Sequence, residues 1–276
     1  MIADLVATPV LERLAAGAAR GDAHVTSGGA AYVDLPGFVL ALTARGVPLM
    51  PNGIVVAELP ATGGPAEAEP GRVAVGDSTV TWDAAHPPSW EPAPAHAQPG
   101  ERAALERRGH AILAALGIDG APSIDGGIAV TASGRGADGA HHLRRALADR
   151  DPDEAALAAD RLIGLGGGLT PEGDDVLAAT AAVVAAIGDA VGFGPADRAR
   201  WLAALIPSDV AERTTALSAT LLTLAAEGRV VEPVHPLVDT GDARWREALV
   251  RLEGAGASTG RAYAVAVGAT LRMLAA

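Results

Sequence analysis

Residues 162–175 read LIGLGGGLTPEGDD, and this stretch decides how the second half of the chain folds. Its glycines predict the end of one helix and a loop. Thr170 is the predicted N-cap of the next helix and Pro171 its first residue, because a hydroxyl accepts a free amide there and proline has no amide hydrogen to satisfy. Such a loop can direct several backbone N–H groups at one anion.

Two acids, Asp174 and Asp175, follow the loop and open an apolar run that ends at Ile187. The stretch lacks the Lys-Ser/Thr pair of a Walker A loop, and it follows an apparent helix rather than the strand of a dinucleotide fingerprint. One interpretation is a site that combines an anion-attracting loop with metal-binding or proton-accepting carboxylates. The alternative is a plain helix start, since these residue types are common there. Gly173 favours a function, because glycine in a helical turn costs roughly 1 kcal/mol relative to alanine.

Two later motifs add polar groups of the same kind. Residues 213–218 read RTTALS within a predicted helix over 208–227, so Thr214 and Ser218 share a face beside Arg213. This arrangement offers a guanidinium and two hydroxyls to a carboxylate or phosphate, although the hydroxyls can instead bond the helix carbonyls. Residues 254–261 read GAGASTGR and begin the last helix near Ser258, either as a second anion-attracting helix start or as a seam of small residues.

Composition excludes several functional classes. The formal net charge is −12 without any basic block, which argues against nucleic acid and anionic membranes as partners. The chain has no cysteine, so disulfides, thiolate nucleophiles and cysteine-based metal sites are excluded. The apolar run from residue 176 to 187 is too short to span a membrane, and the first residues lack the pattern of a signal peptide. We expect a cytoplasmic protein.

The sequence pattern predicts an α+β fold with two domains. A helix is expected over residues 5–20, and short Val-rich stretches between His24 and Trp82 predict a small antiparallel β sheet or barrel. Five prolines between 87 and 99 predict an extended linker. The expected domains are a β-rich N-terminal domain over 1–98 and a mainly α-helical C-terminal domain with the glycine-rich site loop over 99–276.

Local signals place the elements of the helical domain. Asp151-Pro152 is a strong helix start, with an acidic cap followed by proline at the first position. Residues 133–140, which read SGRGADGA, are expected to form a turn or loop, and strands are possible at Ile124 and over 128–130. The other expected helices cover 101–116, 242–252 and 258–276.

The three motifs together resemble a known family. GLGGGLTPEGDDVL, RTTALSA and GASTGRAYAVAVGATL occur in this order in a family that includes the H subunit of oxamate carbamoyltransferase from anaerobic allantoin breakdown. The segments at 51–54 and 75–77 are also similar to the N-terminal half of that family. The chain departs from the usual motifs with Gly167 in place of proline, Glu172 in place of serine and Ala257 in place of histidine.

The resemblance implies one subunit of an enzyme that exchanges a carbamoyl group between oxalurate and phosphate, giving oxamate and carbamoyl phosphate. Other carbamoyltransferase subunits and a small anionic metabolite are the implied partners. Two alternatives remain open. In the first, the chain is a non-catalytic subunit that binds an anionic metabolite or scaffolds the assembly. In the second, it is a separate enzyme with a different small substrate.

The candidate site residues follow from the motifs and the resemblance together. Asp174 and Asp175 are the candidate catalytic residues, which orient an amide nitrogen or bind a divalent cation. No other metal site and no cofactor is predicted. The candidate substrate-binding residues supply backbone N–H groups, hydroxyls and one guanidinium, and they are Gly166, Gly167, Gly168, Thr170, Arg213, Thr214, Ser218, Ser258 and Thr259.

Overall fold

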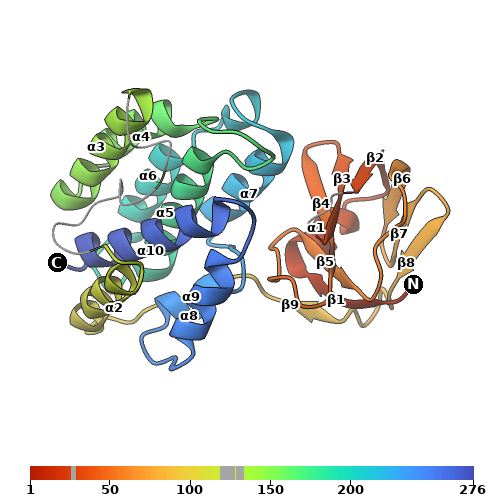
Figure 1. Ribbon diagram of the computed structural model, residues 1–276, viewed down its shortest axis with the longest axis horizontal. Helices are drawn as coiled ribbons and strands as arrows, with labels where there is room; N and C mark the ends of the chain where they lie inside the picture. Colours follow the sequence, from red (N-terminus) through yellow and green to blue (C-terminus); the bar gives the residue numbers. More distant parts are fainter. Residues whose placement is uncertain (26–28, 119–127, 129–133) are drawn as a thin grey trace. The chain divides into compact units, whose positions relative to one another are not determined.

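The computed structural model describes residues 1–25, 29–118, 128 and 134–276, and these divide into two compact units. The first unit covers 1–92 and the second 93–276, so the division falls within the proline-rich segment. Each unit has a hydrophobic core of its own residues. Figure 1 shows a curled sheet in the first unit and helices in the second, which confirms the predicted fold class.

The first unit is a nine-stranded sheet with the order β8-β7-β6-β2-β3-β4-β5-β1-β9. Neighbouring strands are antiparallel except for β4 with β5 and β1 with β9, which are parallel. Val10 and Leu14 of α1 share a core with the inward side chains of the strands. The elements are β1 (Ala3–Ala7), α1 (Thr8–Ala15), β2 (Ala19–Val25), β3 (Ala30–Leu35), β4 (Phe38–Ala44), β5 (Gly53–Val56), β6 (Gly64–Glu69), β7 (Arg72–Val75), β8 (Ser78–Thr81) and β9 (Ser89–Trp90).

The predicted leading helix over 5–20 is too long. Residues 3–7 form β1, and only Thr8–Ala15 is helical. Pro9 lies in the first turn of the helix, where its missing amide hydrogen is not needed. Gly17 has a φ of 129°, a conformation that turns the chain back toward β2.

The second unit is built around α5, which packs against α4, α6, α7, α8 and α10. Every residue of α5 from Gly173 to Ile187 is buried, so its alanines and valines form the centre of the core. The helices are α2 (Arg102–Ala115), α3 (Gly134–Asp149), α4 (Pro152–Leu162), α5 (Glu172–Ile187), α6 (Pro195–Leu205), α7 (Ala216–Ala226), α8 (Val234–Val238), α9 (Trp245–Glu253) and α10 (Thr259–Leu274), with a short 3₁₀ helix, η2 (Val210–Glu212).

Two predictions in this unit are wrong. The segment after residue 133 is not a turn, because α3 begins at Gly134 and its small residues let it pack closely against α4. The predicted helix over 208–227 is interrupted, since η2 ends at Glu212 and α7 begins only at Ala216. The Thr215 hydroxyl accepts the Ser218 amide at 3.1 Å and so caps α7. The strand prediction at Ile124 and 129–130 lies outside the described residues.

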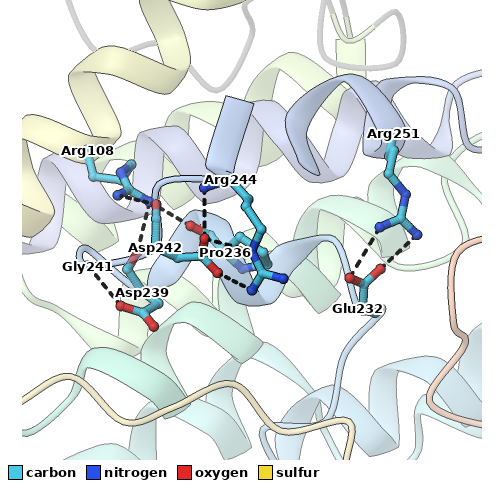
Figure 2. Close-up of polar contacts among 8 residues, drawn as sticks. All are labelled: Arg108, Glu232, Pro236, Asp239, Gly241, Asp242, Arg244 and Arg251. Atoms are coloured by element: carbon cyan, nitrogen blue, oxygen red, sulfur yellow. Dashed lines mark hydrogen bonds and ion pairs between the residues drawn. The ribbon is translucent and has the colours of Figure 1, made fainter. Parts of the chain in front are cut away.

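Arg108 of α2 holds the chain between α8 and α9 in place. Its guanidinium is buried and donates to the carbonyl oxygens of Pro236, Asp239 and Thr240 at 2.6, 2.9 and 2.9 Å. Figure 2 shows this side chain beside Arg244, which instead pairs with the Asp242 carboxylate at 2.7 Å. Arg108 therefore satisfies carbonyl groups that the end of a short helix leaves free.

Candidate functional site

The glycine loop connects α4 to α5 and ends one residue later than predicted. Pro171 is the N-cap residue of α5 and the helix begins at Glu172, whereas Thr170 was expected to be the cap. The Pro171 carbonyl accepts the amides of Asp174 and Asp175 at 3.0 and 3.1 Å. The Thr170 hydroxyl is used elsewhere, because it shares a hydrogen bond of 2.9 Å with the Thr259 hydroxyl.

Two glycines of this stretch are required by close packing. A Cβ on Gly173 would lie 2.2 Å from the Leu162 carbonyl oxygen. A Cβ on Gly164, which has a φ of 69°, would lie 2.5 Å from the Arg213 carbonyl oxygen. The presence of glycine in the first turn of α5 therefore has a packing reason, and it does not by itself indicate a function.

Asp174 joins the first two motifs. Its carboxylate is 1% exposed and has hydrogen bonds at both oxygens. Oδ1 accepts the Gly164 amide at 2.8 Å, and Oδ2 accepts the Ser218 hydroxyl at 2.7 Å and the Thr214 hydroxyl. Thr214 precedes α7, so it reaches Asp174 from the non-helical segment rather than from the predicted helix face. These three donors use most of the roughly four acceptor sites of the carboxylate.

Asp175 is equally buried but its hydrogen bonding is incomplete. The side chain is 2% exposed, and within the described part of the chain its Oδ2 has no hydrogen-bond partner. Burial raises the pKa of this carboxyl well above its usual range, and the charges of Asp174 and Glu172 add to the rise, while the Thr259 hydroxyl opposes it. Burial and the two aspartates also raise the pKa of Tyr263. The region favours a neutral carboxyl at Asp175.

The third motif reaches the site through Thr259. Its hydroxyl lies near the Asp175 carboxyl and bonds the Thr170 hydroxyl, so the start of α10 and the glycine loop meet there. Ser258 occupies the N-cap position of α10, but its side chain makes no capping hydrogen bond. Tyr263 was missed at the sequence level. Its position four residues after Thr259, on the same face of α10, is the pattern that could have identified it.

The tip of the loop leaves backbone donors free. Gly166, Gly167 and Gly168 are exposed, and no residue that the structure describes accepts their N–H groups. The Leu169 carbonyl accepts the Thr215 hydroxyl at 2.5 Å, which ties this side of the loop to the start of α7. The three free amides are the groups available to an anion.

Arg213 is engaged in ion pairs. Its guanidinium pairs with Asp160 of α4 at 2.9 Å and with Asp209 at 3.7 Å, and the side chain is 24% exposed. Of the predicted site residues, Asp174, Thr214 and Ser218 form one hydrogen-bonded group. Thr170, Thr259 and Asp175 form a second group beside it.

The comparison with protein families agrees with the three motifs. Residues 162–271 match the family model described as oxamate carbamoyltransferase subunit AllH. The chain resembles the AllH family. The match begins at the last residue of α4 and contains the loop, the segment before α7 and the start of α10, which confirms the resemblance predicted from the sequence. No curated protein and no solved structure gives a significant match.

Two features are absent from the described residues. None of their helices combines the length and the apolar character needed to cross a membrane. Within the same residues, no group of three or more His, Cys, Asp or Glu side chains is arranged to hold a metal ion.

Proposed function

We propose that the chain is a subunit of a carbamoyltransferase-type enzyme that acts on small anionic amides, with oxamate or oxalurate and carbamoyl phosphate as its ligands. The observation that supports this proposal is the meeting of three separate motifs at the start of α5, inside the region that matches the AllH family. A family of subunits implies other subunits, which we propose as partners of this chain in the cytoplasm.

Each proposed ligand has an anionic end and an amide end, and the site has groups for both. The free N–H groups of Gly166, Gly167 and Gly168 bind the carboxylate or phosphoryl group. The Thr170 hydroxyl, two residues after Gly168, bonds the Thr259 hydroxyl, which lies near the buried acid at Asp175. Donors fixed in this way can stabilise a developing oxyanion by about 3–4 kcal/mol each.

The remaining candidate residues have supporting roles in this proposal. Asp174, Thr214 and Ser218 fix the loop and the start of α7 relative to α5. Arg213 contributes to anion binding only if its guanidinium leaves the ion pair with Asp160 and contacts the ligand instead. Ser258 has no capping bond, so its hydroxyl is free of that role and available to the ligand.

A non-catalytic subunit that binds an anionic metabolite or scaffolds the assembly is the second candidate. It is favoured by the hydrogen bonds at Asp174, which leave one of the two predicted catalytic acids with a structural role. Under this proposal the chain binds the same anions, and another subunit performs the transfer.

Ligand binding and activity together test the proposal. We expect oxamate, oxalurate or carbamoyl phosphate to raise the melting temperature of the chain, since a ligand at 100 times its Kd adds about 2.7 kcal/mol to stability. We expect the complex with its co-purified partner subunits to transfer a carbamoyl group between oxalurate and phosphate. The absence of both effects would contradict the proposal. If the chain binds these anions but substitutions of the candidate residues leave the rate of carbamoyl transfer unchanged, the second candidate is favoured.

A further inference from the structure

The Oδ2 atom of Asp175 points to a missing partner. Buried polar atoms in native proteins nearly always have a hydrogen-bond partner, and each exception requires an explanation. Asp174, the preceding residue, has three donors on its carboxylate, whereas Oδ2 of Asp175 has none among the described residues. A ligand that supplies the missing hydrogen bond is the simplest explanation.

The surroundings of Asp175 define the chemistry of that ligand. The titratable groups that face this carboxyl are Asp174 and Glu172 of α5 and Tyr263 of α10. The carboxylates among them would repel an anionic group. Thr170 and Thr259 are only partly buried, and we expect a ligand to reach Asp175 by breaking the hydrogen bond between their hydroxyls.

A neutral carboxyl has one hydrogen-bond donor and one acceptor, as does the H₂N–C=O edge of a primary amide. Resting on the proposed function, we propose that Asp175 binds the carboxamide or carbamoyl end of the substrate through a pair of hydrogen bonds and thereby selects amides over dicarboxylates. Asp175 accepts one N–H of the amide and donates its own O–H to the amide carbonyl. A second carboxylate would place an acceptor against an acceptor, and it would face the charges of Asp174 and Glu172.

Binding of oxamate and oxalate to the full-length chain, measured by calorimetry, tests this inference. The two ligands differ in having an amide or a carboxylate at one end. In the wild-type protein, oxalate should bind at least about tenfold more weakly than oxamate, because the pair of hydrogen bonds is lost. This comparison needs no variant and therefore does not depend on the folding of one.

Two substitutions assign the preference to Asp175. Asp175→Asn keeps a donor and an acceptor, so oxamate affinity should stay within about threefold of the wild-type value. Asp175→Ala removes both groups, and oxamate affinity should fall at least about tenfold. The matched control is Asp153→Asn, the same change at an exposed first-turn acid of α4, which should leave the preference unchanged. Circular dichroism establishes that each variant is folded.

Three results would overturn the inference: equal affinity of the wild-type chain for the two ligands, no binding of either, or full oxamate affinity in Asp175→Ala. The proposed function fails separately. If the complex with partner subunits transfers no carbamoyl group while the preference for oxamate persists, the proposed function is wrong and the inference holds. If transfer occurs and the KM for oxamate is unchanged in Asp175→Ala, the inference is wrong and the function holds.

Discussion

Asp174 and Asp175 are consecutive and almost fully buried, yet their carboxyl groups are stabilised differently. Hydrogen-bond donors contact both oxygens of Asp174. Such bonds offset most of the free-energy cost of burying a carboxylate away from water. Among the described residues Asp175 has no donor on Oδ2, and its burial beside acidic groups raises its pKa, which favours the protonated form. Asp174 therefore stabilises the fold, while Asp175 has the unused hydrogen-bonding capacity on which the proposed carboxamide site depends.

The role of Asp174 predicts the effect of Ser218→Ala. This substitution removes the donor at 2.7 Å from Asp174 Oδ2, and we expect a loss of about 1–3 kcal/mol in the free energy of unfolding. Thr223→Ala is the matched control, because Thr223 is an exposed hydroxyl residue on the same helix. Urea denaturation of both variants measures the difference, and equal small effects would contradict the assigned role.

Asp175 predicts a pH dependence of stability. A carboxyl whose pKa is raised in the folded state keeps its proton when the unfolded chain has lost it, so stability falls as pH rises above the ordinary value of 3.8. The contribution of the Asp175 carboxyl to the free energy of unfolding is fully present below this ordinary pKa. It is lost as the pH rises through the pKa that the carboxyl has in the folded protein. Removing the ionisable group with Asp175→Asn should remove this fall.

The measurement is the free energy of unfolding of Asp175→Asn minus that of the wild-type protein, from urea denaturation at several pH values. We expect this difference to grow by up to about 1.4 kcal/mol per pH unit above pH 4, until the folded pKa is reached. A difference that does not change with pH would show that Asp175 titrates normally.

The sequence identified these side chains as polar groups near one loop, but it did not distinguish their roles. Thr214 and Ser218 were predicted to share a helix face, and both reach Asp174, although Thr214 does so from outside the helix. The donors of Asp174 from this segment lie 40 and 44 residues away in the chain. No local pattern shows which of two adjacent acids such distant groups will contact.

At the scale of elements, the glycine loop contains one position that requires glycine and another that can accept a side chain. Gly164→Ala should lower stability by at least about 2 kcal/mol, because it combines a positive φ with a Cβ that is 2.5 Å from the Arg213 carbonyl oxygen. Gly167 has no positive φ and no atom within 4 Å of an added Cβ, so Gly167→Ala should change stability by less than about 1 kcal/mol. Thermal denaturation compares the two, and similar losses would contradict the described loop.

Arg108 offers a prediction about how α2 holds the segment between α8 and α9. Arg108→Met keeps most of the apolar stem but removes the donors to three carbonyl groups, and we expect a loss of about 2–4 kcal/mol. Arg251→Ala is the control, because Arg251 is more exposed and pairs with Glu232 near the same helices (Figure 2). Its melting temperature should change little. Comparable losses in the two variants would contradict the role of Arg108.

Short sequence patterns predicted the helix boundaries that are fixed by contacts between residues close together in the chain. The helix start at Asp151-Pro152 is confirmed, with the Asp151 carboxylate accepting the Asp153 amide at 2.9 Å. The break before α7 was not predicted, because it depends on the bond from Thr214 to Asp174 and on the bond from Thr215 to the Leu169 carbonyl. Helix propensity alone favours continuity through such a segment.

At the scale of the whole molecule, the pattern of strand-length and helix-length segments was sufficient for the fold class. The order of the strands was not predictable, since β2 pairs with both β3 and β6, and β5 lies between β4 and β1. Such pairings join segments far apart in the sequence and are fixed by the core that they enclose. The two cores share no residue, so the chain has two candidate folding units.

The boundary between these units gives a prediction about fragments. Contacts divide the chain between Pro92 and Ala93, whereas the sequence placed the second domain at 99–276. Ala97 is buried in the core of the second unit, and its amide donates to the Ala186 carbonyl at 3.0 Å. This carbonyl lies near the end of α5, so residues 93–98 complete the surroundings of the central helix.

We therefore expect the fragment 93–276 to fold alone and to be more stable than the fragment 99–276. The loss of one hydrogen bond and of the buried Ala97 side chain should lower the free energy of unfolding of the shorter fragment by about 1–2 kcal/mol. Urea denaturation followed by circular dichroism compares the two fragments. Equal stability would place residues 93–98 outside the folding unit and favour the boundary predicted from the sequence, because a segment that packs on the core should stabilise it.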